Sequence, residues 1–476
     1  MAIFSSDSLD NIKLKASDIL NRTLDKQVNL AVTGLSRSGK TAFITSLVNQ
    51  LVNEGAEAQL SFFEPVHQGR FIAAKRVPQK HIHVPRFDYD GALNCFCQNP
   101  PSWPEPTKGI SELRVAIKYR PQNSVLKYAT DVATLTLDIT DYPGEWLLDL
   151  PMLGQTFEQW SEKMLSLLAQ EPRKTMANEW LKKVAALDPF APADEVLVAE
   201  LSREYTSLLH LFREKLGLSV IQPGRFILPG DLAGAPILEF FPFTAIQGLD
   251  KNAYQNADDV TMVGMLRARF LEYRERVVKR FYKTHFLNYD RQIVLADCLT
   301  PLNNGKESFE DLQMAINMIL ESYHYGKSSL LNRLFSPKID KLLFAATKAD
   351  HVTPEQHSRL TTLLEQLINQ TKQQLRFDGI AMKTLAISSV KTTESGKSDY
   401  QGEKVPVIRG KSLASDKVVT LFPGTVPTEL PDNDFWQQHK FNFVSFAPNL
   451  AIGKHQVLPH QRIDQVLQFL LGDKMS

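Results

Sequence analysis

Residues 28–41 read VNLAVTGLSRSGKT, and the fold is decided here. The first six residues are a short, mostly apolar run, which predicts a buried strand. The run leads into residues 34–41, which fit the spacing G-x-x-x-x-G-K-[ST] at every fixed position. Apolar residues at helical spacing follow over residues 42–52. A strand, a glycine-bounded loop and a helix in this order predict a phosphate-binding P-loop.

The residue types in this loop suit the phosphates of a nucleotide. Gly34 and Gly39 permit turns that bring successive backbone N–H groups onto the phosphates. Lys40 places a positive charge between the outer phosphates, and the Thr41 hydroxyl can bind Mg²⁺. The positive end of the following helix adds to this attraction. The residues expected to contact the phosphates are Ser36, Arg37, Ser38, Gly39, Lys40, Thr41 and Ala42.

A P-loop also needs a carboxylate at the end of a neighbouring strand to hold the metal ion. Residues 135–145 read LTLDITDYPGE and contain two candidates. Asp141 ends the predicted strand and begins the pattern Asp-x-x-Gly, so we expect it to serve the metal. Asp138 is expected to be an ordinary strand residue. The backbone N–H of Gly144 would then sense the γ-phosphate.

A nucleotide switch needs a further Ser or Thr hydroxyl for the metal, located between the loop and the acid. Residues 106–110, PTKGI, precede a predicted strand and offer Thr107. Ser111 is the alternative. We therefore expect the metal to be served by Thr41, Thr107 and Asp141.

Residues 347–350, TKAD, follow another predicted strand and indicate which base is recognised. The carboxylate of Asp350 can accept from both the ring N–H and the exocyclic amine of guanine, whereas adenine offers no matching pair of donors. Lys348 can lay its aliphatic stem over the base. After the next strand, Ser389 and Val390 can present a backbone N–H to the guanine carbonyl. The pattern favours guanine nucleotides.

Alternating strands and helices predict an α/β fold with a mostly parallel sheet and helices on both faces. The six strands expected in this sheet are 28–33, 113–119, 132–140, 292–297, 341–346 and 383–387. Short strands are expected at 405–408 and 418–422, and an edge strand at 442–446. Residues 463–471 are expected to close the chain as a helix.

The pattern also predicts how the chain divides. A discontinuous P-loop domain is expected over 27–146 and 287–476. An all-α helical insert domain is expected over 147–286, where long helical patterns replace the strands. Residues 55–107, rich in proline and aromatics, predict an irregular insertion, and residues 391–423 predict a hairpin insertion.

Composition is ordinary for a globular protein of two or three domains. The 476 residues are 43% hydrophobic and 22% charged, and the formal net charge is +1, so nothing indicates a nucleic-acid partner. The three cysteines form no disulfide framework or zinc-spaced cluster, which favours a reducing cytoplasm. No apolar run is long enough for a transmembrane segment. Residues 1–26 predict an amphipathic helix packed on the protein, with a peripheral, membrane-surface helix as the alternative.

Residues 325–332, YGKSSLLN, imitate a second P-loop. The position of the first glycine holds Glu321, and the preceding segment has a helical rather than a strand pattern. This stretch therefore predicts a junction between two helices.

Together these motifs resemble the Ras-like G-domain, and most of all the YcjX family of bacterial P-loop proteins. Three further stretches are similar to that family: PGRFILPGDLAGAPILEFFPF, SLLNRLFSPKIDKLLFAATKADHV and VLQFLLGDK. The resemblance covers nearly the whole chain. It implies a cytoplasmic protein linked to the stress response and the phage-shock neighbourhood, with a protein effector from that setting. The family has also been described as an ATPase.

Two residues depart from the common G-protein pattern. Many G-proteins place Gln after Asp-x-x-Gly to orient the attacking water, and here Glu145 stands there. A carboxylate can accept a proton from water, but it repels phosphate. The loop sequence around Arg37 resembles that of guanylate-binding proteins and atlastins, in which this Arg acts as a cis arginine finger. The alternative is that Arg37 points to solvent or pairs with an acid of the long insertion.

The leading hypothesis is a Mg²⁺-dependent GTPase that acts as a switch through the helical insert. The alternatives are a nucleotide-dependent scaffold with negligible turnover and an ATPase. The residues expected to act in hydrolysis are Lys40, Arg37, Thr107, Gly144 and Glu145.

Overall fold

The computed structural model describes residues 26–35, 37–53, 59–122, 131–323, 339–377, 379–439, 441–448 and 457–476. Three sequence predictions fall outside these ranges. They are the N-terminal helix up to residue 25, the contribution of Ser36 to the phosphate loop, and the helix junction at 325–332.

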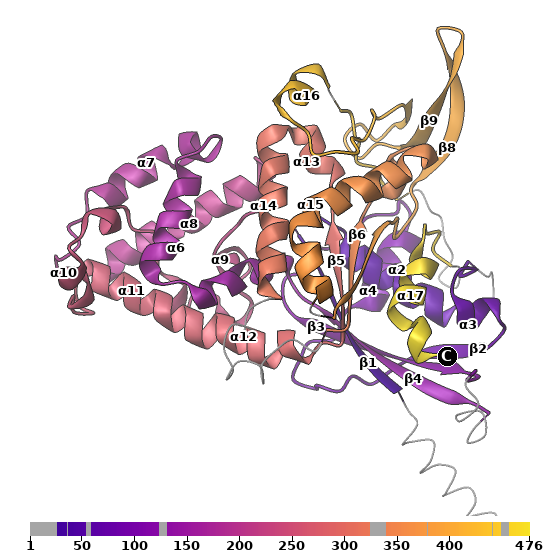
Figure 1. Cartoon of the computed structure of the whole chain (residues 1–476), viewed down its shortest axis with the longest axis horizontal. Coiled ribbons are helices and arrows are strands. Elements are labelled where there is room, and N and C mark those ends of the chain that lie inside the picture. Colours follow the sequence, from indigo (N-terminus) through magenta and orange to yellow (C-terminus); the bar gives the residue numbers. More distant parts are fainter. Residues whose placement is uncertain are drawn as a thin grey trace, which may run out of the picture.

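A seven-stranded mixed sheet of order β2-β3-β4-β1-β5-β6-β7 forms the centre of the molecule (Figure 1). Its strands are β1 (Lys26–Gly34), β2 (Phe71–Val77), β3 (Ser111–Tyr119), β4 (Ala133–Asp141), β5 (Arg291–Ala296), β6 (Lys341–Ala346) and β7 (Ala381–Ala386). From β4 to β7 the neighbouring strands run parallel, whereas β2 and β3 add an antiparallel edge. The six expected strands are all present. The interior strand β5 is buried along its whole length, as a strand covered on both faces must be.

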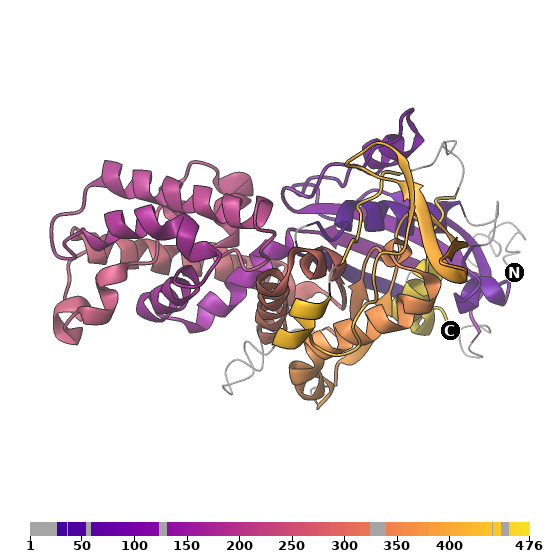
Figure 2. The same cartoon turned by 90° about the horizontal axis from the view of Figure 1, so that it is seen from above.

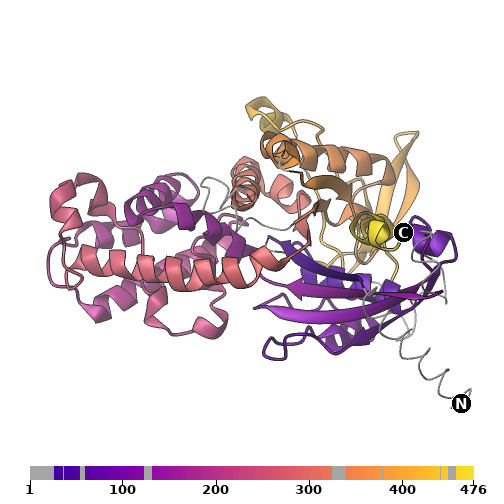
Figure 3. The ribbon, with the colours of Figure 1, turned by 60° about the horizontal axis from the view of Figure 1, so that its bottom comes forward.

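Helices cover both faces of this sheet (Figure 3). On one face lie α2 (Lys40–Val52), α4 (Tyr89–Cys97) and α17 (Ile463–Leu471), whose apolar residues share one core with the sheet. On the other face lie α13 (Leu299–Asn304), α14 (Lys306–Ser322) and α15 (His357–Phe377). The expected closing helix at 463–471 is confirmed. The α/β class predicted from the sequence is thus confirmed.

Further helices connect β4 to β5 and pack together beside the sheet (Figures 1 and 2). They are the 3₁₀ segment η1 (Gly144–Gly154), α6 (Phe157–Leu168), α7 (Arg173–Ala185), α8 (Glu195–Glu214), α9 (Gly224–Ile227), α10 (Lys251–Gln255), α11 (Met262–Glu272), the π-helical turn η5 (Tyr273–Val278) and α12 (Lys279–Thr284). Trp160 is fully buried at their centre, where its ring lies 5.3 Å from that of Phe240 and 5.4 Å from that of Phe270. In the described part of the chain, no helix combines the length and apolar character that crossing a membrane requires.

Short 3₁₀ segments complete the connections. They are η2 (Gly230–Leu232), η3 (Pro236–Leu238), η4 (Thr244–Gly248), η6 (Phe286–Asn288), η8 (Ala349–His351), η9 (Pro354–Gln356) and η10 (Gly472–Lys474).

Two predictions for the insertions are wrong. The insertion before β3 is not irregular throughout: it contains α3 (Glu64–His67), the edge strand β2, and α4. β2 was missed because five of its seven residues are polar, small or exposed, so the strand shows no clear apolar alternation. Residues 442–446 do not form an edge strand, because their pairing is limited to one bridge, between Phe446 and Ser412.

The C-terminal insertion forms a second, three-stranded antiparallel sheet, which projects from the molecule in Figure 1. Its strands are β8 (Thr393–Tyr400), β9 (Glu403–Lys411) and β10 (Val418–Leu421), followed by the short helix α16 (Asn433–Gln438). The strands expected at 405–408 and 418–422 are confirmed with small shifts of their ends. The strand β8 was not predicted, because its residues are mostly polar and exposed and show no apolar pattern.

Candidate nucleotide-binding site

The loop between β1 and α2 depends on two glycines. Gly39 has φ 81°, a left-handed conformation that favours glycine, and it directly precedes α2. At Gly34, an added Cβ would lie 2.6 Å from the carbonyl oxygen of Leu295 on the neighbouring strand β5. Both positions of the motif are therefore occupied by glycine for steric reasons in this fold.

The first turn of α2 is suited to an anion. It contains no acidic residue, and no side chain of the described residues caps its backbone N–H groups. Free N–H groups and the positive end of the helix dipole attract phosphate. The Lys40 ammonium folds back over the loop and donates to the carbonyl oxygen of Gly34, at 2.8 Å. Lys40 therefore lies across the glycine loop, and its role on the phosphates stays a prediction.

The three residues expected to serve a metal ion lie at one edge of the site. The Thr107 hydroxyl donates to Oδ2 of Asp141 at 2.6 Å. The Thr41 hydroxyl donates to the carbonyl oxygen of Glu105 at 3.0 Å. Residues 105–107 thus link the first turn of α2 to the end of β4.

Asp141 has the surroundings of a metal carboxylate. Its side chain is 3% exposed, and Oδ1 is buried without a hydrogen-bond partner among the described residues. Burial raises the pKa of Asp141 to about 6, although Lys40 and the Thr107 hydroxyl act in the opposite direction. A cation would satisfy the unpaired oxygen and favour the ionised form. The donor set of one carboxylate and two hydroxyls fits Mg²⁺, which prefers oxygen ligands and retains water.

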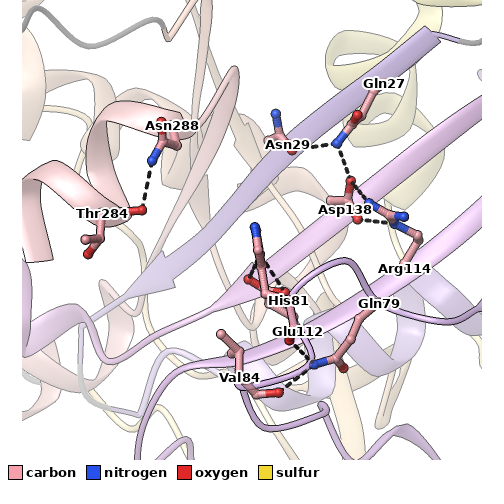
Figure 4. A network of polar contacts seen from close by, with 10 residues as sticks. All are labelled: Gln27, Asn29, Gln79, His81, Val84, Glu112, Arg114, Asp138, Thr284 and Asn288. Atoms are coloured by element: carbon pink, nitrogen blue, oxygen red, sulfur yellow. Dashed lines mark hydrogen bonds and ion pairs between the residues drawn. The ribbon is translucent and has the colours of Figure 1, made fainter.

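Asp138, the other acid of this stretch, is held elsewhere. Asp138 accepts from Nε of Arg114 at 2.5 Å and from the Gln27 amide at 2.7 Å, in a polar ladder across three strands (Figure 4). Ser111, the alternative to Thr107, begins strand β3 and lies opposite Asp141 in the pairing of β3 with β4. The expectation that Asp138 is an ordinary strand residue is confirmed by this ladder.

The segment after Asp141 presses against the phosphate loop. An added Cβ at Gly144 would lie 2.2 Å from the carbonyl oxygen of Gly34, so glycine is required for this approach. The next residue, Glu145, is 4% exposed and lies 3.9 Å from the Arg213 guanidinium of α8. Glu145 does not line the cavity described below. Its expected role in hydrolysis stays a prediction, and its side chain is directed toward the helices instead.

Arg37 is also directed toward the helices. It has a positive φ of 62°, and its guanidinium donates to the carbonyl oxygen of Glu214 at the end of α8, at 3.4 Å. Arg37 is exposed, in keeping with the alternative that it points to solvent, and its partner here is a backbone carbonyl of α8 rather than an acid of the long insertion. The arginine-finger role stays a prediction.

The residues expected to read the base lie at the ends of β6 and β7. Asp350 is 5% exposed, and its Oδ2 accepts from the backbone N–H of Thr392 at 2.7 Å and from the Thr392 hydroxyl at 2.9 Å. Lys348 adopts a left-handed conformation, and its ammonium pairs with Asp297 at 2.5 Å. Burial alone would raise the pKa of Asp297, but Lys348 and Thr300 outweigh it and hold that pKa below its usual value.

One cavity of about 420 Å³ unites the phosphate and base ends of the site. At one end it is lined by Arg37, Ser38, Gly39, Lys40, Thr41, Ala42 and Thr107; at the other it is lined by Thr347, Lys348, Asp350, Ser388, Ser389 and Val390. Sequence segments more than 300 residues apart therefore face one volume. Its size suits a small organic ligand.

Sequence reasoning missed a third set of lining residues: Trp103, Pro104, Pro106, His351, Leu413, Ser445 and Phe446. Trp103 comes from the insertion before β3 and Leu413 from the C-terminal insertion, whereas Phe446 follows that insertion and is bridged to it at Ser412. The proline-flanked Trp103 could have been noticed as an aromatic in a long loop. No local signal distinguished Phe446, because its contacts are distant in sequence.

The mostly parallel sheet, the helices on both of its faces and the glycine loop between β1 and α2 define a Ras-like P-loop α/β fold with additional helices between β4 and β5. The comparisons with known proteins agree with this class and identify the family within it.

The chain belongs to the YcjX-like family, DUF463, whose family model matches residues 28–475. A protein of Escherichia coli (strain K12) named "Ras-like GTPase YcjX" is 48% identical over 467 residues, covering 98% of this chain and 100% of that protein. A protein of the same name from Shewanella oneidensis (strain ATCC 700550 / JCM 31522 / CIP 106686 / LMG 19005 / NCIMB 14063 / MR-1) is 44% identical over 480 residues, covering 98% of this chain and 99% of that protein. The expected family resemblance is confirmed.

Proposed function

We propose that this protein binds guanine nucleotides and hydrolyses GTP to GDP and phosphate with Mg²⁺. The observation that carries this proposal is the single cavity that joins the P-loop residues to Asp350. The relatives from Escherichia coli and Shewanella oneidensis, both named Ras-like GTPase, support the same activity.

Guanine selectivity follows from the chemistry of Asp350. Thr392 holds one carboxylate oxygen through two hydrogen bonds, which fixes the orientation of the group beside the cavity. A fixed carboxylate can accept from the ring N–H and the exocyclic amine of guanine. Adenine presents no such pair of donors, so binding ATP would leave the nearly buried carboxylate without a donor from the base, and its second oxygen would lose the partner that guanine supplies. Unpaired buried polar groups are costly, and such sites reject mismatched ligands strongly.

The phosphate end supplies charge and orientation. Lys40 and the backbone N–H groups of the loop and α2 would hold the phosphates, and Gly144 would sense the γ-phosphate through its backbone N–H. Thr41, Thr107 and Asp141 would hold Mg²⁺, which neutralises charge on the phosphate oxygens when it is bound. In phosphoryl transfer, such positioning and charge stabilisation provide most of the catalysis.

Calorimetric titration tests the proposal. GDP should bind more tightly than ADP, by up to about 10⁴-fold for a site that pairs both donors of the base. Asp350→Asn should weaken GDP binding and admit xanthosine diphosphate, whose carbonyl can accept from the new amide. Asp399→Asn, an exposed change on β8, is the matched control and should bind GDP as the parent does. Equal affinities of the parent for ADP and GDP would refute guanine selectivity and favour the ATPase alternative.

A second candidate is a nucleotide-dependent scaffold with negligible turnover. One observation favours it: Glu145 is buried against Arg213 and does not line the cavity, so it is not poised to orient a water molecule. The rate of phosphate release from GTP, measured with and without K⁺, separates the two functions. A cytoplasmic, stress-linked switch with a protein effector is the setting that the family resemblance favours for either of them.

A further inference from the structure

The insertion before β3 meets the segment that follows the C-terminal insertion at the wall of the cavity. Trp103, from the insertion before β3, donates its indole N–H to the carbonyl oxygen of Phe446 at 2.9 Å. The two residues are separated by 343 positions in the chain, and both line the cavity. The indole is partly exposed, whereas Phe446 is 1% exposed. Trp103 is therefore more available to a ligand than Phe446 is.

The position of Phe446 is fixed by the end of strand β9. On one side of Phe446, the backbone N–H of Leu413 donates to the carbonyl of Ser445 at 2.9 Å. On the other side, the N–H of Ala447 donates to the carbonyl of Lys411 at 2.8 Å. The ring packs on Gly410, where an added Cβ would lie 2.7 Å from Cδ1 of Phe446. The three-stranded sheet thus holds the carbonyl that accepts from Trp103.

Phe446 also contacts the base end of the site. Its ring meets that of His351 edge-on, with 5.0 Å between centroids. His351 directly follows Asp350, the residue proposed to read guanine. The hydrogen bond from Trp103 to Phe446 therefore places the indole next to the base end of the cavity.

Trp103 belongs at the same time to the segment that reaches the metal-binding residues. A few positions further along the chain, Glu105 accepts from the Thr41 hydroxyl and Thr107 donates to Asp141. Behind the indole, the ring of Phe96 on α4 packs edge-on at 5.7 Å. The segment 103–107 therefore runs from the base end to the metal end of the cavity, held at both ends.

We propose that Trp103 is a nucleotide-holding residue that contacts the guanosine moiety, and that the C-terminal insertion positions it through the Phe446 carbonyl. The three-stranded sheet then controls how fast the nucleotide leaves. This inference rests on the proposed guanine-nucleotide function. Contacts between an aromatic side chain and a base change binding by on the order of tenfold or more.

Stopped-flow release of a fluorescent GDP analogue tests this inference. Trp103→Leu should raise the dissociation rate by about tenfold or more. Trp103→Phe, which keeps a ring but loses the N–H donor, should raise it less. Gly410→Ala leaves Trp103 unchanged but displaces Phe446, and it should also accelerate release. Gly396→Ala on β8, where an added Cβ meets nothing within 4 Å, and Trp436→Phe on α16 are the matched controls and should release GDP at the parental rate.

A second readout separates positioning from general damage. Inorganic tripolyphosphate lacks guanosine, so its affinity should be the same in the parent, Trp103→Leu and Gly410→Ala. GDP should change the tryptophan fluorescence of the parent, and Trp103→Phe should lose that change. A parallel loss of tripolyphosphate affinity would overturn the assignment, because it would place the defect in the phosphate loop.

The two proposals fail in different ways. Equal ADP and GDP affinities of the parent would overturn the nucleotide function and this inference together. A guanine-selective parent whose Trp103→Leu and Gly410→Ala variants release GDP within twofold of the parental rate would overturn this inference alone.

Discussion

Lys40 shows how one side chain can combine a structural and a binding role. Its ammonium donates to the carbonyl oxygen of Gly34, so it already lies across the loop that would receive the phosphates. It is also the cation that most directly counters the buried Asp141. A ligand bearing several negative charges would therefore find a cation positioned in advance.

Lys40→Ala should consequently abolish measurable binding of GTP and GDP in calorimetry. Lys75→Ala on the edge strand β2 removes an exposed lysine of the same type and should leave both affinities unchanged. Normal GTP hydrolysis by a folded Lys40→Ala protein would show that the phosphates bind elsewhere.

Two arginines stand at the junction between the phosphate loop and α8. Arg37 donates to the carbonyl of Glu214, and Arg213 faces Glu145. Arg37 also lines the cavity, whereas Arg213 does not. A guanidinium on the γ-phosphate can stabilise the transition state, an effect typically worth about 10³–10⁵ in rate.

We expect Arg37→Ala to lower kcat for GTP by at least about 10²-fold while GDP affinity changes little, because the contact would form mainly in the transition state. Arg213→Ala is the matched variant and should keep kcat within a few-fold of the parent. Single-turnover hydrolysis measures both. A loss confined to Arg213→Ala would assign the role to α8, and parental rates in both variants would end the arginine-finger hypothesis.

Among the elements, η1 joins the phosphate loop to the helices. Its residue Asp149 is buried and accepts from the N–H of Gly224 at 2.8 Å and from the Tyr273 hydroxyl at 2.5 Å. Burial raises the pKa of Asp149 to about 7, although these hydrogen bonds and Arg225 oppose the shift. One carboxyl group therefore connects η1 with α9 and with the π-helical turn.

The raised pKa predicts how stability depends on pH. The folded protein binds the proton of Asp149 more tightly than the unfolded chain does. The resulting stabilisation of the folded state is fully present below pH 4. It is lost as pH rises toward 7, by at most about 4 kcal/mol in the free energy of unfolding. Asp149→Asn should remove this loss.

Thermal unfolding at a series of pH values provides the measurement. The melting temperature of Asp149→Asn relative to the parent should rise between pH 4 and pH 7.5. Asp399→Asn on β8 is again the control, and its difference from the parent should not vary with pH. A flat difference for Asp149→Asn as well would contradict a raised pKa.

The sequence predicted the elements with strong local patterns and missed those that depend on distant partners. The strand β1 and the helix α2 were found because an apolar run and a helical period flank a fixed motif. The strand β2 pairs with β3 at the edge of the sheet and is largely exposed. Its sequence therefore lacks the alternation of apolar and polar residues from which a strand is predicted. Trp103 shows the same limit within the site, because its significance comes from Phe446, 343 residues away.

At the scale of the whole molecule, the helices between β4 and β5 are joined to the phosphate loop through a continuous packed path. Gly144 presses on Gly34, and the apolar residues of η1 share one hydrophobic core with α6, α8 and α11. The indole N–H of Trp146, within η1, donates to the carbonyl oxygen of Leu228. The Arg225 guanidinium lies over the Trp146 ring, with its Cζ 3.3 Å from the ring centroid. Whether these helices form a separate domain stays a prediction.

This path predicts that the helices respond to the nucleotide. A γ-phosphate that accepts a hydrogen bond from the backbone N–H of Gly144 would pull this residue toward the nucleotide and so shift η1. Because packed cores rearrange between discrete states rather than deform smoothly, the shift would reach α9 and the end of α8.

Hydrogen exchange should therefore differ between the complexes with GDP and with a GTP analogue at Gly144–Gly154 and at the end of α8. α17, on the opposite face of the sheet, should exchange alike in both states. Gly144→Ala should abolish the difference, since its Cβ would lie 2.2 Å from the Gly34 carbonyl. Identical exchange in the two complexes of the parent would show that the helices are not coupled to the nucleotide.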